Sequence, residues 1–243
     1  AKLLNMKNRN ALITGASGGL GFVIAETLAE LGSNLILVDK QDSDFSKLDR
    51  TLSPLTNIKY KKIKCDLEDE SERNSLIKEV KKNKKGLSCL INNAAFTGST
   101  SLDGWTTEFE KQSLKVWRRS IEVNLTSIFH LSRDLSSELN KSKGGNIINI
   151  SSIYDELGPD WRLYKDTNMG NPAAYSVSKG GLLQLTRWMA TTLSPKVRVN
   201  AISPGGIFRN QPNKFVKKYE NRTPLQRMAN ENDFRGVIAY LAS

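Results

Sequence analysis

The stretch that decides the fold is Thr14-Gly15-Ala16-Ser17-Gly18-Gly19-Leu20-Gly21. An apolar run precedes it and an amphipathic run follows it to Leu31, which predicts a strand, a glycine turn and a helix. Gly15 would permit the tight bend, Gly19 the close approach of a pyrophosphate, and Gly21 the packing of helix on strand. The pyrophosphate would lie on free N–H groups at the helix N-terminus. An ordinary strand–helix turn has similar spacing, so the rest of the chain must distinguish the two interpretations.

Strand-like and helical patterns alternate along the chain. We expect strands at about residues 10–14, 34–38, 58–65, 87–91, 146–150 and 197–202. We expect helices at about 19–31, 69–82, 114–140, 172–193, 213–219 and 231–242, with mainly irregular segments at 43–57, 96–112 and 151–172. The alternation predicts an α/β fold, a Rossmann-type doubly wound parallel sheet in three α/β/α layers, as a single domain over residues 1–243.

Polar or glycine-rich positions follow the predicted strands. They are Thr14, Asp39, Asp66, Asn93, Ser152 and Pro204. In open parallel sheets, ligands bind beyond the carboxyl ends of the strands, so an active site is expected at this edge.

Asp39 indicates which dinucleotide the site prefers. It follows the second predicted strand, 24 residues after Gly15. An acid there can bind both ribose hydroxyls of NAD and repel the 2′-phosphate of NADP. Position 18 is glycine rather than the Arg or Lys that would attract that phosphate, whereas Lys40 argues weakly for NADP. We therefore expect NAD, with NADP less favoured.

Composition excludes several other functions. The 243 residues carry a net charge of +11, but the lysines are scattered without interleaved aromatic residues, so a solvated face is favoured over a nucleic-acid surface. The chain has neither a run of about 18 apolar residues nor a signal-peptide core, so we expect a cytoplasmic protein without a membrane partner. Cys65 and Cys89 are expected to be reduced and buried, and His130, the single histidine, offers no metal site.

Tyr175 and Lys179 stand four residues apart and would share one face of a helix. An ammonium beside the phenol should lower the tyrosine pKa from about 10 and make it usable as a general acid–base. Ser152 could hydrogen-bond the substrate oxygen, with Ser151 as a rival for that role. Asn124 lies inside a predicted helix, where asparagine is disfavoured, which indicates a functional or helix-bending role.

Taken in order, these motifs resemble those of the short-chain dehydrogenase/reductase family, in its single-domain branch, over nearly the whole chain. The matching motifs are Thr14–Gly21, Asp66-Leu67, Asn92-Asn93-Ala94-Ala95, Asn124, Ser152, Tyr175 with Lys179, and Pro204-Gly205.

The resemblance implies roles for individual residues. Tyr175 would give or take the proton, Ser152 would stabilise the substrate oxygen, and Lys179 would hold the ribose and lower the tyrosine pKa. Asn124 would hold a water molecule in a proton relay. The implied cofactor-binding residues are Gly15, Ser17, Gly19, Leu20, Gly21, Asp39, Asp66, Leu67, Asn93, Ala94, Tyr175, Lys179, Pro204, Gly205 and Ile207. The resemblance also implies a homodimer or homotetramer through the helices at about 114–140 and 173–193.

Three features depart from the family pattern. The Ser152–Tyr175 interval is longer than usual, and its extra segment, 155–171, carries Trp161, Arg162 and Tyr164. With Arg209, these residues suggest a polar, phosphorylated or sugar substrate, although a plain surface loop is equally compatible. The threonine that often follows Pro-Gly to hold the carboxamide is missing. The last strand of the family sheet is expected to be absent, because the sequence stops at Ser243.

The loops narrow the expectation further. Those at 158–164, 171–175 and 203–212 resemble reductases of bacterial flagellin-modification and nonulosonic-acid clusters. We expect an NAD(P)-dependent oxidoreductase that moves hydride between nicotinamide and a carbonyl or secondary alcohol of a sugar-type substrate, in surface-polysaccharide or flagellin-glycan biosynthesis. The alternative enzyme is a 3-oxoacyl-acyl-carrier-protein reductase. A non-catalytic, dinucleotide-binding regulatory protein is the alternative from another class.

Overall fold

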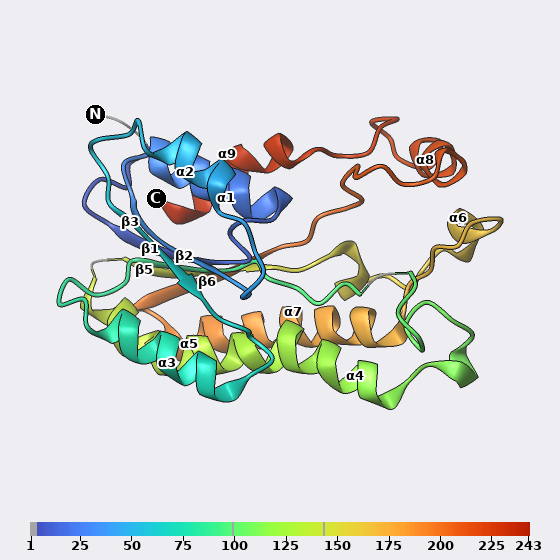
Figure 1. Ribbon diagram of the computed structural model, residues 1–243, viewed down its shortest axis with the longest axis horizontal. Helices are drawn as coiled ribbons and strands as arrows, with labels where there is room; N and C mark the ends of the chain where they lie inside the picture. Colours follow the sequence, from blue (N-terminus) through green and yellow to red (C-terminus); the bar gives the residue numbers. More distant parts are fainter. Residues whose placement is uncertain (1–3, 99, 143) are drawn as a thin grey trace.

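A computed structural model describes residues 4–98, 100–142 and 144–243. In this part of the chain, six parallel strands form one sheet in the order β3-β2-β1-β4-β5-β6 (Figure 1). The strands are β1 (Asn10–Thr14), β2 (Asn34–Asp39), β3 (Tyr60–Lys64), β4 (Cys89–Asn92), β5 (Gly145–Ile150) and β6 (Val197–Ile202). The expected doubly wound sheet is confirmed.

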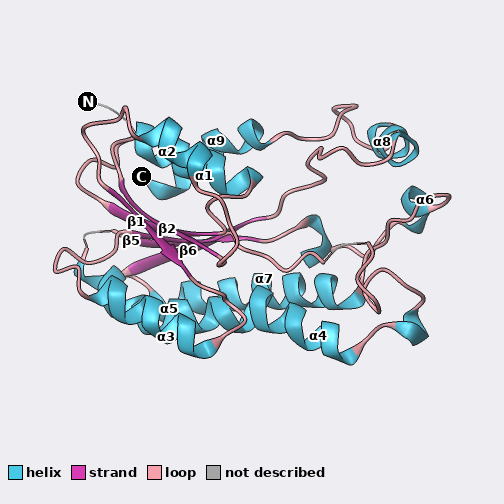
Figure 2. Ribbon diagram, viewed as in Figure 1, coloured by secondary structure: helices cyan, strands magenta, loops and turns pink. Residues whose placement is uncertain are grey.

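Helices cover both faces of the sheet, which confirms the three layers (Figure 2). One face carries α1 (Gly19–Glu30), α2 (Ser46–Leu52) and α9 (Arg235–Ala242). The other carries α3 (Glu70–Lys81), α4 (Leu114–Ile121), α5 (Ser127–Lys141) and α7 (Ala173–Leu193). The short α6 (Trp161–Tyr164) and α8 (Asn213–Glu220) lie beside each other, away from these layers.

The central strands are apolar on both faces, because each face is covered by helices. Successive strand residues point to opposite sides, so Ala11 and Ile13 pack with α1 whereas Leu12 packs in the core beneath α3 and α5. The edge strand β3 instead carries exposed lysines. Two apolar cores therefore fix the sheet between its helices and hold the strand ends at one edge.

Several boundaries differ from the sequence-based expectation. The helix expected at 114–140 is interrupted by a π-helical turn, Glu122–Thr126, between α4 and α5. The segment expected to be irregular at 151–172 contains a 3₁₀ turn, Ile153–Asp155, and the single turn of α6. A second 3₁₀ turn, Glu231–Phe234, precedes α9. Among the described helices, none is both long and apolar enough to cross a membrane.

Candidate active site

The glycine turn after β1 is shaped by close backbone contacts. Gly15 has a φ of +64°, in the left-handed region that favours glycine. A Cβ on Gly21 would lie 1.9 Å from the carbonyl oxygen of Gly15, so only glycine fits at the first turn of α1. Across the sheet, the Asn93 side chain donates to the carbonyls of Thr14 and Gly15, at 3.0 and 3.1 Å. Asn93 thus fixes the turn from the neighbouring strand β4.

The N-terminus of α1 suits an anionic ligand. Its N-cap, Gly18, makes no side-chain cap, and the first turn of the helix contains no acidic residue. Free N–H groups and the helix dipole favour a phosphate at such a position. The residues present therefore fit the pyrophosphate of a dinucleotide.

Asp39 braces the glycine turn from the end of β2. Its carboxylate accepts hydrogen bonds from the backbone N and Oγ of Ser17, at 2.8 and 2.7 Å. Its other oxygen accepts from the backbone N of Lys40 and from Ser43 Oγ. Sequence reasoning placed Asp39 at the ribose but missed this link to Ser17.

A central cavity of about 560 Å³ lies beyond the strand ends. It is lined by the predicted cofactor and catalytic positions Gly15, Ser17, Gly19, Leu20, Gly21, Asp39, Asn93, Ala94, Ser152, Tyr175, Lys179, Pro204, Gly205 and Ile207. Asp66 and Leu67 line an adjoining lateral cavity of about 550 Å³, which shares Gly15, Asp39 and Ala94 with the central one. The two cavities together give an elongated ligand a continuous lining.

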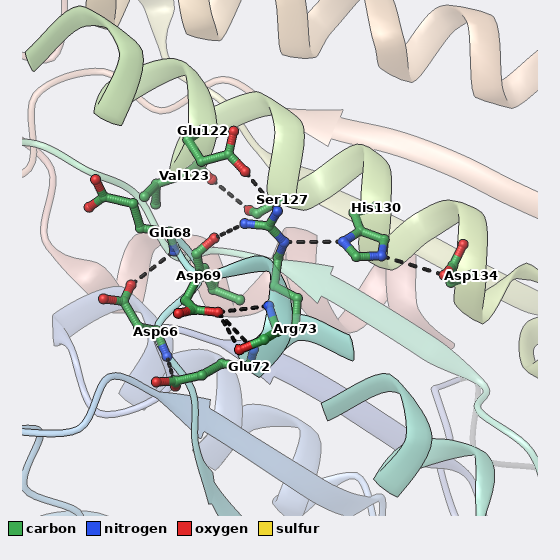
Figure 3. A network of polar contacts seen from close by, with 12 residues as sticks. Asp66, Glu68, Asp69, Glu72, Arg73, Glu122, Val123, Ser127, His130 and Asp134 are labelled. Atoms are coloured by element: carbon green, nitrogen blue, oxygen red, sulfur yellow. Dashed lines mark hydrogen bonds and ion pairs between the residues drawn. The ribbon is translucent and has the colours of Figure 1, made fainter. Parts of the chain in front are cut away.

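Arg73 is the centre of a network of polar contacts behind Leu67, which lines the lateral cavity; Figure 3 shows the contacts of Arg73 with α5 and the π-helical turn. Arg73 on α3 is 2% exposed and donates to the main-chain carbonyl of Leu67. Its Nη2 lies 2.7 Å from Glu122 Oε1, and its Nε donates to His130 Nδ1 at 3.1 Å. Arg73 therefore connects Leu67 to the π-helical turn and α5.

The sequence analysis did not single out Arg73. The residue falls on the same helical face as the apolar Leu76, Ile77 and Val80, and this position could have indicated that the arginine is buried.

Lys179 is buried beneath Tyr175. Lys179 is only 2% exposed. Its Nζ donates to the main-chain carbonyl of Ile150 at 2.8 Å and lies 5.8 Å from the centroid of the Tyr175 ring. Burial lowers the pKa of Lys179 to about 8. An ammonium has three donors, so two remain for a ligand such as a ribose.

The expected lowering of the Tyr175 pKa is not found. Burial of the phenol raises its pKa, against smaller opposite effects of a hydrogen bond with Ser152 and the charge of Arg209. Desolvation disfavours the phenolate, and this effect is larger than those of the neighbouring groups. The spacing of Tyr175 and Lys179 correctly predicted that both lie on one helix. It could not predict how deeply the phenol is buried.

Asn124 is fully buried in the π-helical turn and holds the chain that follows β4. Its Oδ1 accepts from the backbone N of Phe96 at 2.6 Å, and its Nδ2 faces the Phe96 carbonyl at 3.1 Å. Ser120 and Ser178 offer further acceptors to Nδ2. The amide is thus held by protein groups, and the relay water implied by the resemblance stays a prediction.

Ser151 and Ser152 both line the central cavity, but they have different partners. Ser151 Oγ donates to the carbonyl of Lys179 at 3.4 Å. Ser152 Oγ accepts from the backbone N of Tyr154 at 3.3 Å, and Ser152 is the serine that acts to lower the pKa of Tyr175. This favours Ser152 over Ser151 for the catalytic role.

The four expected substrate residues separate into two groups. Tyr164 and Arg209 line the central cavity, together with the unpredicted aromatic residues Tyr154, Phe215 and Tyr219. Trp161 lies instead at a second cavity, and Arg162 lines neither, because its exposed guanidinium pairs with Asp160 at 2.8 Å. Trp161 therefore lies at a different cavity from Tyr164 and Arg209, and a substrate role for Trp161 and Arg162 stays a prediction.

Arg209 and Glu231 meet above the glycine turn. Arg209 Nε lies 3.3 Å from Glu231 Oε1, and a Cβ on Gly19 would lie 2.6 Å from that same oxygen. A carboxylate therefore occupies the neighbourhood of the α1 N-terminus, where an anion is favoured.

Comparisons with known proteins bear on the family to which the chain belongs. The family model for short chain dehydrogenases matches residues 9–218. The chain is 27% identical over 245 residues to the 3-oxoacyl-[acyl-carrier-protein] reductase FabG of Aquifex aeolicus, covering 99% of this chain and 92% of that protein. It is 25% identical over 239 residues to post-translational flagellin modification protein A of Campylobacter coli, covering 98% and 92%. The structure of a short chain dehydrogenase from Leptospira borgpetersenii with bound NAD⁺ is 29% identical, with a TM-score of 0.84 over 98% of this chain and 87% of that chain.

The chain belongs to the short-chain dehydrogenase/reductase family. It is an NAD(P)-dependent oxidoreductase that acts on CH–OH groups. Identity to FabG and to the flagellin protein is similar, so it does not select a substrate.

Proposed function

We propose that the enzyme interconverts a secondary alcohol and a carbonyl on a polyhydroxylated, sugar-type substrate, in the biosynthesis of surface polysaccharide or flagellin glycan. One observation carries this proposal: the hydroxyls of Tyr154 and Tyr164 lie 2.5 Å apart at the central cavity. One O–H donates to the other oxygen, which leaves a second hydrogen and free lone pairs for substrate hydroxyls.

The proposed chemistry uses the residues around Tyr175. Bound NAD(P) would accept or supply the hydride. Tyr175 exchanges the proton of the substrate oxygen, and Ser152 holds that oxygen toward the phenol. Lys179 binds ribose hydroxyls with its two remaining donors, and its charge would favour the phenolate once a ligand orders the site. Asn124 acts from the π-helical turn by holding the backbone at Phe96, which follows the Asn93-Ala94 wall of the cavity.

The cofactor that we propose is NAD. The carboxylate of Asp39 lies at the central cavity and would repel a 2′-phosphate, since its local partners are neutral N–H and O–H groups. We also propose a homodimer or homotetramer through α4, α5 and α7. Apolar side chains exposed on these helices support it, including Leu114, Phe129 and Trp188. Light scattering on the purified protein tests the assembly.

Reduction of 3-oxoacyl chains on acyl carrier protein is the second candidate. The net charge of +11 favours it, because acyl carrier proteins are acidic partners in this chemistry and opposite charges speed association. The Tyr154–Tyr164 hydroxyl pair argues for the sugar-type substrate instead, since an acyl chain offers no acceptor to the hydroxyl hydrogen that the pair leaves free.

The test combines cofactor binding with a substrate screen. NADH binding is followed by fluorescence, and NAD⁺ reduction is measured with sugars and polyols in parallel with reduction of acetoacetyl-acyl carrier protein. We expect oxidation of at least one polyol, and a Tyr175→Phe variant that binds NADH normally but turns over about 10³-fold more slowly. Turnover of the acyl substrate alone would select the second candidate, and binding without any turnover would select a regulatory protein.

A further inference from the structure

We propose that a second cavity, beside the catalytic one, binds a further sugar unit of the substrate. This distal cavity of about 420 Å³ includes Trp105, Thr106, Trp161, Met169, Gly170 and Asn171 in its lining. The inference rests on the proposed sugar-type substrate and extends it from one polyhydroxylated unit to two.

The distal cavity adjoins the central one. Met169 lines both cavities. The Trp161 and Tyr164 rings, one from each cavity, contact each other with centroids 5.8 Å apart. Tyr164 also forms the hydroxyl pair with Tyr154, so a substrate held at that pair would reach Trp161 with its next unit.

The lining suits a neutral, polyhydroxylated ligand. The Trp161 side chain is 59% exposed at the cavity, where an aromatic face can cover the C–H face of a sugar ring. Asn171 is 7% exposed, and its Oδ1 accepts from Ser176 Oγ at 3.0 Å. Its Nδ2 has no acceptor within the described part of the chain. A buried donor without a partner is costly, and a small movement of the amide would let a ligand hydroxyl accept from it.

The charges nearby argue against a phosphate at this position. Lys111 lines the cavity but pairs with Glu108 at 2.6 Å. The Arg162 guanidinium, on the same helical turn as Trp161, pairs with Asp160. Both cations are already neutralised by neighbours, so the ligand class that fits is an uncharged glycosyl unit.

The inserted segment is held in place by contacts with the chain around α8. Asp160 Oδ2 lies 3.2 Å from Arg222 Nε, which follows α8. Leu163 and Tyr164 are buried against Phe215 and Met228. This packing gives the segment a defined position over the central cavity, as a substrate-binding element requires and a plain surface loop does not.

The experiment compares matched ligands with and without a second unit. Sorbitol is paired with maltitol, which carries one added glucose, and gluconate is paired with maltobionate. Binding of each to the protein saturated with NADH is measured by calorimetry. We expect the glucosylated member of at least one pair to bind about tenfold more tightly than its parent, from one stacked ring and one added hydrogen bond.

Four variants test whether the gain in affinity arises at the distal cavity. Trp161→Ala removes the aromatic face, and Gly170→Leu fills the cavity from a position where a Cβ would meet Thr106 Cβ at an ordinary 3.6 Å. Both should abolish the gain, which is taken in each variant as the ratio of its affinities for the glucosylated ligand and the parent ligand. Arg162→Ala, on the same turn but outside both cavities, is the matched control and should keep the gain. Gly170→Ala should keep it too and shows that the position tolerates a side chain.

The outcomes separate the two proposals. If the parent polyols bind and are oxidised but the glucosylated ligands gain nothing, or gain equally in Trp161→Ala and Gly170→Leu, the distal subsite is rejected and the proposed function stands. If none of the four ligands binds but the screen finds another polyol that is oxidised, the distal subsite is rejected and the proposed function stands, whereas no binding and no polyol oxidation reject both proposals. A gain confined to the wild type and the two control variants supports the subsite, whether or not hydride transfer is observed.

Discussion

Lys179 donates through Nζ to the main-chain carbonyl of Ile150, two residues before Ser152. The lysine thus fastens the end of β5 to α7 and joins the two elements that carry Ser152 and Tyr175. This contact gives Lys179 a structural role that is independent of any bound cofactor. Its burial also makes the stability of the fold depend on pH in a defined window.

The stability difference between the wild type and Lys179→Met should change with pH. The folded pKa of Lys179 is about 8, below its ordinary value of 10.5. Between these values the unfolded chain holds a proton that the folded chain has lost, so the stability contributed by this group rises with pH. We expect the wild type to gain up to about 3 kcal/mol over the variant from pH 8 to pH 10.5, with no change below pH 7. Urea unfolding at several pH values measures this, and a constant difference up to pH 10 would contradict it.

Asp39 should control the choice of cofactor. We expect the wild type to bind NADH more tightly than NADPH, and Asp39→Ala to reduce that preference about tenfold, because the repulsion of the 2′-phosphate is lost. Asp39→Asn keeps an oxygen that can accept from Ser17 but removes the negative charge. This variant therefore distinguishes the repulsion of the 2′-phosphate from the support that Asp39 gives to the glycine turn. Asp42→Ala, an exposed acid paired with Lys40, is the control. Tighter NADPH binding by the unaltered protein would refute the assignment.

Glu231 should weaken cofactor binding. Its carboxylate lies against Gly19, near the helix N-terminus that suits the pyrophosphate. Glu231→Gln removes the competing charge and frees Arg209, so we expect the Kd for NADH to fall about fivefold. Glu220→Gln makes the same charge change on α8 and should leave the Kd unaltered. An unchanged or weaker Kd for Glu231→Gln would show that the carboxylate does not compete.

Arg73 should stabilise the fold and the wall of the lateral cavity together. Arg73→Met leaves Glu122 and His130 without their partner, and we expect a loss of about 3 kcal/mol in the free energy of unfolding. NADH binding should also weaken, since the Leu67 carbonyl loses its donor. Arg73→Lys should restore little, because one ammonium cannot contact all three partners. Arg133→Met, exposed on α5, is the control. If Arg73→Met loses stability but binds NADH as tightly as the wild type, Arg73 has a structural role only.

The sequence predicted the sheet, because alternating apolar and helical patterns report burial directly. It also placed Gly15, Ser152, Tyr175 and Lys179 at one edge, since parallel strand ends meet there. The direction of the Tyr175 pKa shift depends on how strongly the folded chain desolvates the phenol. The four-residue spacing of Tyr175 and Lys179 in the sequence does not indicate this burial. Trp161 and Tyr164 are three residues apart, yet a single helical turn points them into different cavities.

The π-helical turn at Glu122–Thr126 changes the helical phase within what reads as one long helix. A π turn holds one more residue between hydrogen-bonded partners than an α turn, which advances the phase by about 100°. A helical wheel drawn through α4 and α5 together therefore misassigns the inward face of one of them. Any engineering of this helix should treat residues before and after the turn as two separate registers. Deleting a single residue there would rotate Asn124 away from Phe96 while leaving the composition of both helices intact.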